Sequence, residues 1–402
     1  MTSSGRVATP VNAEVPVAAE GEFPKLHIGP LEVWPPVVLA PMAGVTNAPF
    51  RSLCREFGAG LYVSEMITAR GYLMRNRLTH KLASFDADEK PRSLQIYGSD
   101  PIDVGAMTRE LVSEDAVDHL DMNFGCPVPK VTRAGGGSAI PLKPRLLARL
   151  VRAAVRSAGD IPVTIKVRMG LDVDLETYRD AGRVAQEEGA AAIGLHARTA
   201  NQLYSGEADW AAITRLVEDL DIPVLGNGDI FEAFDALRMM RDTGCAGVIV
   251  GRGCLGRPWL FRELAQVFDG QEPDTPPNLG EIGRILEDHA GRLVAFFGET
   301  MGWRQMRKWC GWYTKGFRGS ASVRAELSRI DGLEDLRAAF ARLDPDEPFP
   351  ITALRAHRAK GSKTQRVKLP EGYLEDLDDD TPPSSPHSEA DRQAFERALS
   401  GG

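Results

Sequence analysis

The sequence predicts an α/β fold: a (βα)8 TIM barrel followed by a small C-terminal helical domain, with disordered tails at both ends. Short apolar runs rich in β-forming residues recur along the chain, and helical patterns such as LLARLVRAAVRSAG lie between most of them. Alternating strands and helices indicate parallel βαβ units, and eight such units favour a closed barrel. After residue 270 the strands stop and only helical patterns follow.

Eight runs are predicted to be the barrel strands. Several of them are apolar on both faces, which is typical of strands covered by helices on one side and by the barrel core on the other. In chain order the runs are residues 37–42, 61–66, 93–98, 119–125, 163–169, 192–198, 223–229 and 247–253.

Four segments are expected along the 402 residues. Residues 23–272 would form the barrel, and residues 277–345 a separate domain of three helices. Residues 1–22 and 346–402 lack helical or strand periodicity, so we predict a disordered N-terminal tail and a charged, mostly disordered C-terminal tail. The C-terminal tail turns from basic to acidic, a pattern typical of a solvated segment, and its basic residues are Arg355, Arg358, Lys360, Lys363, Arg366 and Lys368.

Composition narrows the class of protein. The formal charge of −8 is a weak argument against nucleic acid as a partner. The cysteine count is odd and no CxxC pair occurs, so we expect reduced thiols, no metal site and a cytoplasmic location. We see neither a signal peptide nor an apolar run long enough for a membrane span, and we expect a monomer. The cysteines are Cys54, Cys126, Cys245, Cys254 and Cys310.

Functional residues of a βα barrel lie at the carboxyl ends of its strands, and the polar residues of this chain collect at those ends. They follow strands one, three, four, five, six, seven and eight. The candidates are Pro41, Met42, Ala43, Gln95, Asn123, Cys126, Lys166, Arg168, His196, Arg198, Asn227, Gly228, Asp229, Gly251 and Arg252.

The last two strand ends indicate an anion site. Glycines such as Gly228 and Gly251 let backbone N–H groups approach a phosphate, and the loops after strands seven and eight are the usual phosphate site of this fold. Arg252 adds a permanent positive charge. The alternative interpretation is two ordinary glycine turns.

Three further side chains have competing interpretations. Lys166 could stabilise negative charge on a reduced flavin, or be a salt-bridged barrel lysine. His196 could contact the cofactor, or be a satisfied core histidine. Cys126 stands in a Gly-Cys-Pro turn before a glycine-rich loop, where it could be a reactive thiol or an inert buried one.

Eight motifs in this order resemble the tRNA-dihydrouridine synthases, most nearly the B-type bacterial enzymes: PMAGVTN, QIYG, DMNFGCPVPKV, GGGSA, KVRMG, HARTANQLYSG, NGDI and GRG. Each motif alone is weak evidence, but eight in order at strand ends are strong. The match covers about residues 25–345. The resemblance implies an FMN-binding barrel, a helical tRNA-binding domain, and reduction of uridine to dihydrouridine in the D-loop of tRNA.

The resemblance also implies roles for individual residues. NADPH, or NADH in its place, would reduce FMN, which would pass hydride to uracil C6 while the thiol of Cys126 gives a proton to C5. A thiol suits this role because its ordinary pKa of about 8.5 keeps it protonated at neutral pH. The expected FMN contacts are Pro41, Met42, Ala43, Gln95, Asn123, Lys166, His196, Asn227, Gly228, Asp229, Gly251 and Arg252.

A basic segment at residues 304–318 is predicted to bind tRNA. It carries five positive charges and no acid, and most of them share one helical face. The alternative is an exposed cationic helix whose aromatic residues are core. The predicted RNA contacts are Arg304, Arg307, Lys308, Trp312, Tyr313, Lys315 and, from the barrel, Arg198.

Two positions depart from the family pattern, and other functions compete. The family usually has His at Trp309, so that contact cannot be carried over. It usually has Gly at Ala197, which is a mild change beside the expected flavin. One alternative is an FMN barrel that acts on a free pyrimidine, and a second is a non-catalytic RNA-binding protein. A third, an isomerase or aldolase-type phosphate barrel, gives Gln95 and Cys126 no role.

Overall fold

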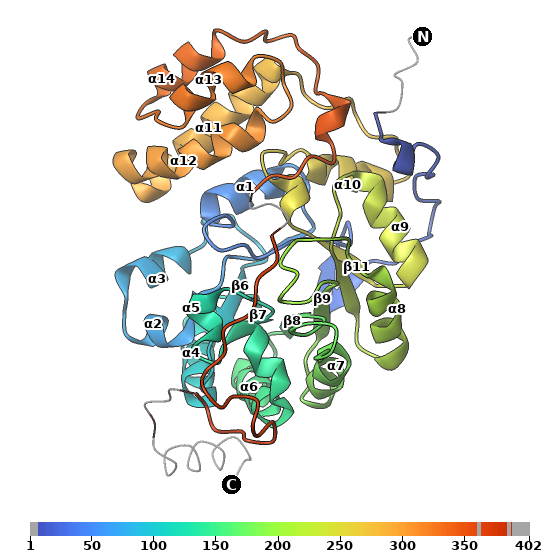
Figure 1. Ribbon diagram of the computed structural model, residues 1–402, viewed down its shortest axis with the longest axis vertical. Helices are drawn as coiled ribbons and strands as arrows, with labels where there is room; N and C mark the ends of the chain where they lie inside the picture. Colours follow the sequence, from blue (N-terminus) through green and yellow to red (C-terminus); the bar gives the residue numbers. More distant parts are fainter. Residues whose placement is uncertain (1–6, 360–362, 384–386, 388–402) are drawn as a thin grey trace.

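The computed structural model describes residues 7–359, 363–383 and 387. Its centre is a parallel sheet wrapped by helices, as Figure 1 shows. Every pair of neighbouring strands in this sheet is parallel. In spatial order the strands are β4 (Leu61–Tyr62), β3 (Val37–Leu39), β11 (Gly247–Val250), β10 (Val224–Asn227), β9 (Ala192–His196), β8 (Val163–Arg168), β7 (His119–Phe124), β6 (Ser93–Tyr97) and β5 (Ile67–Thr68).

The sheet closes through the second predicted strand, which is divided into two short pieces. β4 pairs with β3, β5 pairs with β6, and a parallel bridge joins Val63 to Ser93 between them. The Ser64 backbone N–H donates to Ser93 O at 3.0 Å across the same seam. Since β3 also pairs with β11, the strands form a ring, and the predicted barrel is confirmed.

Helices cover the outside of the barrel and begin where the sequence signals them. Asn47 and Asp100 cap two of them, and each cap residue accepts a hydrogen bond from a backbone N–H of the first turn. The covering helices are α1 (Ala48–Glu56), α2 (Ala69–Leu73), α3 (Arg77–Leu82), α4 (Pro101–Ser113), α6 (Pro144–Ala158), α7 (Tyr178–Glu187), α8 (Trp210–Asp219), α9 (Ala233–Thr243) and α10 (Leu260–Phe268). None of the described helices is long and apolar enough to cross a membrane.

An antiparallel hairpin closes the amino end of the barrel. It consists of β1 (Leu26–Ile28) and β2 (Leu31–Val33). Its buried side chains pack against the lower interior of the barrel, including Leu225 and Ile249. The opposite, carboxyl end of the strands therefore remains available for function.

The C-terminal helical region contains four described helices rather than the three predicted. They are α11 (Leu279–Phe297), α12 (Glu299–Tyr313), α13 (Ser320–Leu327) and α14 (Leu333–Phe340). The additional helix, α13, is short and buries only Ser320, Val323 and Leu327, which is too sparse an apolar stripe to recognise from sequence.

Trp309 of α12 lies at the centre of the contact between this helical region and the barrel. Its ring centroid is 4.5 Å from that of Phe50 in α1 and 4.5 Å from that of His289 in α11. Gly256 allows a barrel loop to approach the same helix, because a Cβ there would lie 2.5 Å from the carbonyl carbon of Trp312. Trp309, which stands where the family usually has His, therefore lies in the core of the interface between the helical region and the barrel.

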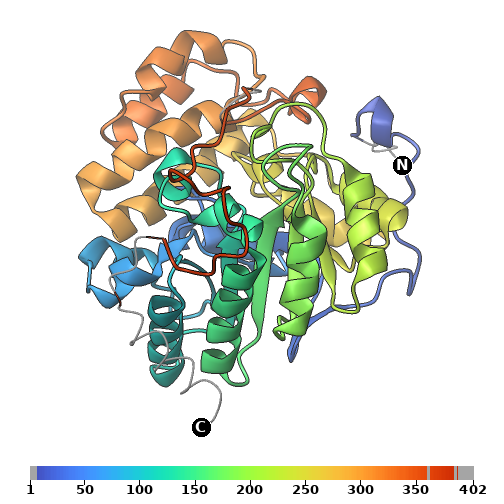
Figure 2. The same cartoon turned by 60° about the horizontal axis from the view of Figure 1, so that its bottom comes forward.

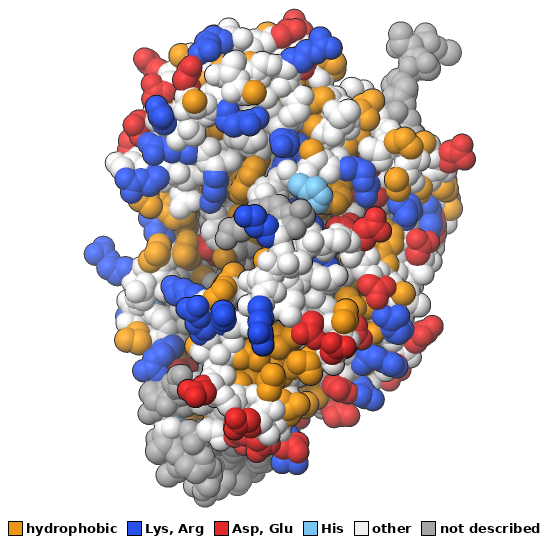
Figure 3. All heavy atoms as spheres, in the orientation of Figure 1, with side chains coloured by type: hydrophobic (Ala, Val, Ile, Leu, Met, Phe, Trp, Pro, Cys, Tyr) orange, Lys and Arg blue, Asp and Glu red, His pale blue; other side chains and the backbone are white. Residues whose placement is uncertain are grey.

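The predicted disorder of the C-terminal tail is corrected for its described residues. Residues 363–383, here called the strap, run past the loops at the carboxyl end of the barrel and along α6 (Figure 2). Lysine and arginine side chains gather over the neighbouring short helix α5 (Pro129–Thr132) in Figure 3. Lys360 lies outside the described residues.

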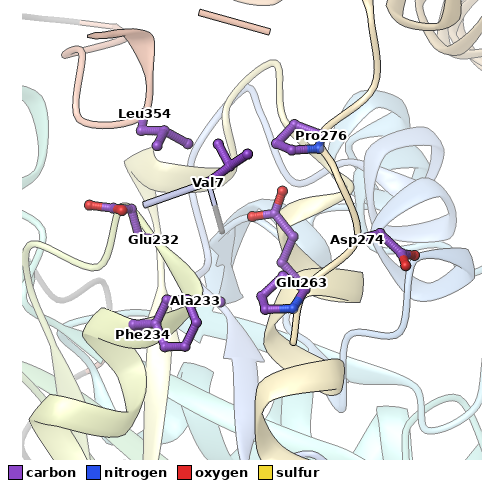
Figure 4. A pocket seen from close by; sticks show the side chains of 9 residues that line it. Val7, Glu232, Ala233, Phe234, Glu263, Asp274, Pro276 and Leu354 are labelled. Carbon is purple, nitrogen blue, oxygen red and sulfur yellow. The ribbon is translucent and has the colours of Figure 1, made fainter. Parts of the chain in front are cut away.

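The N-terminal tail is corrected in the same way. The Thr9 backbone N–H donates to Glu232 at 2.8 Å, and the Ala18 N–H donates to Val267 O at 2.9 Å, so residues 7–22 follow α9 and α10. Val7 also lines a small pocket with Glu232 and Glu263 (Figure 4). Residues 1–6 lie outside the described part of the chain.

Replacing Trp309 with alanine is expected to lower the free energy of unfolding by about 3–5 kcal/mol, because the truncation leaves a cavity in a packed interface. Urea denaturation followed by circular dichroism measures the loss. The control is Trp312→Ala one turn away, where the half-buried side chain should cost clearly less. Equal losses would contradict a central place for Trp309.

Candidate active site

A chain of side-chain hydrogen bonds ends at Cys126. Asn123 Oδ1 accepts from the Cys126 backbone N–H at 2.9 Å, and Asn123 Nδ2 donates to Gln95 Oε1 at 2.8 Å. Gln95 Nε2 in turn donates to Asp121 Oδ2 at 2.6 Å. Each amide is therefore fixed in orientation by the next group, and the turn that carries Cys126 is tied to the barrel interior.

Asp121 belongs to this series of hydrogen bonds but is absent from the residues predicted from the sequence. It also accepts from Thr164 Oγ1 at 2.7 Å, and burial raises the pKa of its carboxyl group. It precedes Asn123 by two residues on β7, so the two side chains share the inner face of the strand. The separation of two residues between Asp121 and Asn123 could have predicted from the sequence that Asp121 faces the same site.

Cys126 is the exception among the five cysteines, because the other four are buried and it is only partly buried. The following loop folds back over it: the Ser138 N–H donates to Cys126 O at 3.0 Å. Gly137 makes this possible, since its φ is +57° and a Cβ there would lie 2.4 Å from Cys126 O. Partial burial raises the pKa of the thiol above its ordinary value, so the thiol is protonated at neutral pH.

Four cations converge on His196 at the barrel mouth. Burial first, and then the nearby positive charges, hold the pKa of His196 well below its ordinary value, so the ring is neutral. Lys166 Nζ donates to Asn227 Oδ1 at 2.9 Å, and burial lowers the pKa of this lysine. The four cations are Lys166, Arg168, Arg198 and Arg252.

The turns after β10 and β11 complete an anion site. Gly228 has φ +138°, and a Cβ there would lie 2.6 Å from Ala208 Cβ, so only glycine fits the turn. Asp229 accepts two hydrogen bonds of 2.7 Å from Arg198 and lies 3.5 Å from Arg252. Arg198 Nη1 is buried and has no hydrogen-bond partner among the described residues. A bound anion would satisfy it.

Apolar side chains border this mouth on the β3 side. Pro41 and Met42 are half-buried and Ala43 is exposed. The Met42 N–H donates to Thr46 Oγ1 at 2.9 Å, which fixes the turn. Such a surface suits a planar aromatic ring better than it suits water.

Comparison with known proteins identifies the family. The protein-family model described as "Dihydrouridine synthase (Dus)" matches residues 38–344 of this chain. A Mycobacterium tuberculosis protein named "Probable tRNA-dihydrouridine synthase" is 52% identical over 366 residues, which covers 89% of this chain and 94% of that protein. The chain belongs to the dihydrouridine synthase family.

Two further relatives show how far the similarity extends. A Mycobacterium leprae protein of the same name is 48% identical and covers 86% of this chain and 97% of its own length. The tRNA-dihydrouridine synthase B of Xanthomonas campestris is 40% identical and covers 76% of this chain and 92% of its own length. The strap lies beyond residue 344, where the family match ends.

Two of the predicted RNA contacts are corrected by burial. Tyr313 is fully buried, and its hydroxyl lies 3.2 Å from His289 Nδ1. Arg198 is 1% exposed and holds Asp229 inside the dihydrouridine synthase barrel. Neither side chain reaches the surface, so neither can contact RNA directly.

The other predicted RNA contacts in residues 304–318 divide into two groups. Arg307 donates to Ile330 O at 3.0 Å and pairs with Asp331, and Lys308 donates to Gly44 O in the barrel. Both therefore have structural contacts. Arg304 and Lys315 are exposed, and Trp312 is half-buried. These last three stay available as predicted RNA contacts.

Limited alkylation with iodoacetamide is expected to label Cys126 first, because the other thiols are buried. Its rate should rise with pH to a midpoint above the ordinary thiol value of about 8.5, since thiolate is the nucleophile and burial disfavours it. Peptide mass spectrometry at a series of pH values measures both features. A midpoint below pH 8, or earlier labelling of Cys245, would contradict this account.

Proposed function

We propose that this protein binds FMN at the carboxyl end of its barrel and reduces uridine to 5,6-dihydrouridine in the D-loop of tRNA, with NADPH, or NADH in its place, as reductant. The observation that carries the proposal is the position of Cys126. The thiol of Cys126 is partly exposed and protonated. Asn123 ties its turn to the same strand ends that carry the cations of the anion site.

The residues present fit the phosphate of FMN. Gly228 and Gly251 would expose backbone N–H groups to it, and Arg252 would neutralise its charge. The free Nη1 of buried Arg198 supports an anion at this place. Asp229, an acid, would serve by holding Arg198 rather than by touching the phosphate, and Asn227 holds Lys166.

The remaining strand ends suit the flavin ring. Lys166 would stabilise negative charge on the reduced ring, and neutral His196 would lie near the ribityl chain. Gln95 and Asn123 are fixed by Asp121, so their amides would present one defined donor and acceptor pattern to the cofactor. Pro41, Met42 and Ala43 would form the apolar border of the site.

The reaction adds a hydride and a proton across C5=C6 of uracil. FMN held at the strand ends would supply hydride chemistry at C6, and the thiol of Cys126 would give its proton to C5. A raised pKa keeps that proton in place until the base arrives. The uridine must leave its stack in folded tRNA to reach the thiol, so the protein must also grip the RNA outside the barrel.

The phosphate assignment is tested with Arg252→Gln. Loss of one charged contact should weaken FMN binding by about 10- to 100-fold, because hydrogen bonds to charged groups contribute about 1.5–3 kcal/mol. Riboflavin, which has no phosphate, should bind the parent and the variant equally. Flavin fluorescence titration measures both ligands, with Arg183→Gln on the outer helix α7 as control. Equal loss for both flavins would contradict a phosphate contact.

The reaction itself is tested with Cys126→Ala on tRNA that lacks dihydrouridine. Dihydrouridine formation should fall by about 10²- to 10⁴-fold, as expected when a general acid is removed. NADPH should still reduce the bound flavin at the parent rate, and Cys245→Ala should keep full activity. Full tRNA reduction by Cys126→Ala would refute the acid role. Orotate or uracil turned over faster than tRNA by the parent would favour the free-pyrimidine alternative.

A further inference from the structure

The strap is attached at the mouth of the barrel, directly beside the catalytic turn. Gln365 Nε2 donates to Pro127 O at 2.8 Å, and Pro127 follows Cys126. The Gln365 backbone N–H donates to Asn201 O at 2.9 Å, and the Val367 N–H donates to Asn201 Oδ1 at 2.8 Å. The strap therefore joins the loops that follow β7 and β9.

Side chains alternate along this part of the strap. Gln365, Val367 and Leu369 are half-buried against the barrel, whereas Arg366 and Lys368 between them are exposed. This period of two is that of an extended chain with one face packed and one face in solvent. The packed face fixes the backbone, and the basic face is presented outward.

The acidic part of the strap is used differently. Asp379 lies 2.7 Å from Lys143, and Asp380 lies 3.3 Å from Arg149 on α6. Tyr373 is buried, and its hydroxyl donates to Ala139 O at 3.2 Å. These contacts anchor the far end of the strap and pair Asp379 and Asp380 with cations of the barrel.

Part of the surface beside the strap is also basic. Lys130 and Arg133 in and after α5 are exposed, in the region where Figure 3 shows lysine and arginine side chains gathered. Within residues 7–359, 363–383 and 387, no ion pair is formed by Lys130, Arg133, Lys363, Arg366 or Lys368. A local excess of positive charge thus stands on a chain of net charge −8.

We propose that the exposed basic residues of the strap, Lys363, Arg366 and Lys368, form a second tRNA-binding surface that contacts RNA phosphates beside Cys126. Unpaired lysines and arginines on a rigid backbone suit the phosphates of a nucleic acid and carry no sequence preference. The inference rests on the proposed function and extends it. It adds a contact from residues beyond the family match, which ends at residue 344.

The experiment compares two triple variants with equal loss of charge. One is Lys363→Ala/Arg366→Ala/Lys368→Ala. The control is Lys25→Ala/Arg156→Ala/Arg183→Ala, in the hairpin at the amino end of the barrel and on the outer helices α6 and α7. Affinity for tRNA is measured across 50–200 mM salt, a range of about the physiological order, together with kcat and KM for tRNA reduction.

The strap variant should bind tRNA about tenfold or more weakly, and the slope of log affinity against log salt should fall by about one for each lost phosphate contact. KM for tRNA should rise, while reduction of the flavin by NADPH stays unchanged. The control variant should match the parent. The charge-conserving variant Lys363→Arg/Arg366→Lys/Lys368→Arg should restore both affinity and slope, which a purely structural role of the strap would not predict.

Affinity and salt slope equal to the parent in the alanine variant would overturn the inference. That result leaves the proposed function intact as long as the parent reduces tRNA in the same assay. Failure of the parent to form dihydrouridine would instead refute the proposed function.

Discussion

The structure depends on the burial of several cations at the carboxyl end of one barrel. Removing a charge from water costs several kcal/mol, so each cation needs fixed partners. Arg168 donates to the carbonyls of Gly125 and Thr199, Lys166 donates to Asn227, and Arg198 is held by Asp229. These partners all lie at strand ends or in the turns that follow, and one nitrogen of Arg198 has no hydrogen-bond partner among the described residues.

The series of hydrogen bonds that links Asp121 to Cys126 complements that charged region. The cations provide a positive potential, whereas Asp121, Gln95 and Asn123 provide orientation through hydrogen bonds of 2.6–2.9 Å. A thiol that donates a proton must be held near its target and must stay protonated. In the proposed reaction the Asn123 contact would meet the first requirement, and partial burial of Cys126, which raises its pKa, would meet the second.

Exposed positive charge is distributed differently from what the basic helix suggested. The aromatic residues Trp309 and Tyr313 are used to join the helical region to the barrel, and Arg307 and Lys308 have contacts within the protein. Exposed positive charge is left at the ends of α12 and along the strap. Because Gln365 of the strap donates a hydrogen bond to Pro127, the charge of the strap lies beside the loop that follows Cys126.

The sequence alone determined the barrel, the positions of its strands and the polar residues at their carboxyl ends, because strand periodicity and motif order are local properties. It also singled out Cys126. Only the tertiary structure decided that Asp121 orients the site, that Arg198 and Tyr313 are buried, and that residues 7–22 and most of the C-terminal tail are packed against the barrel. Burial depends on contacts between segments far apart in the chain: Gln365 and Pro127 are separated by 238 residues, and no local pattern encodes their meeting.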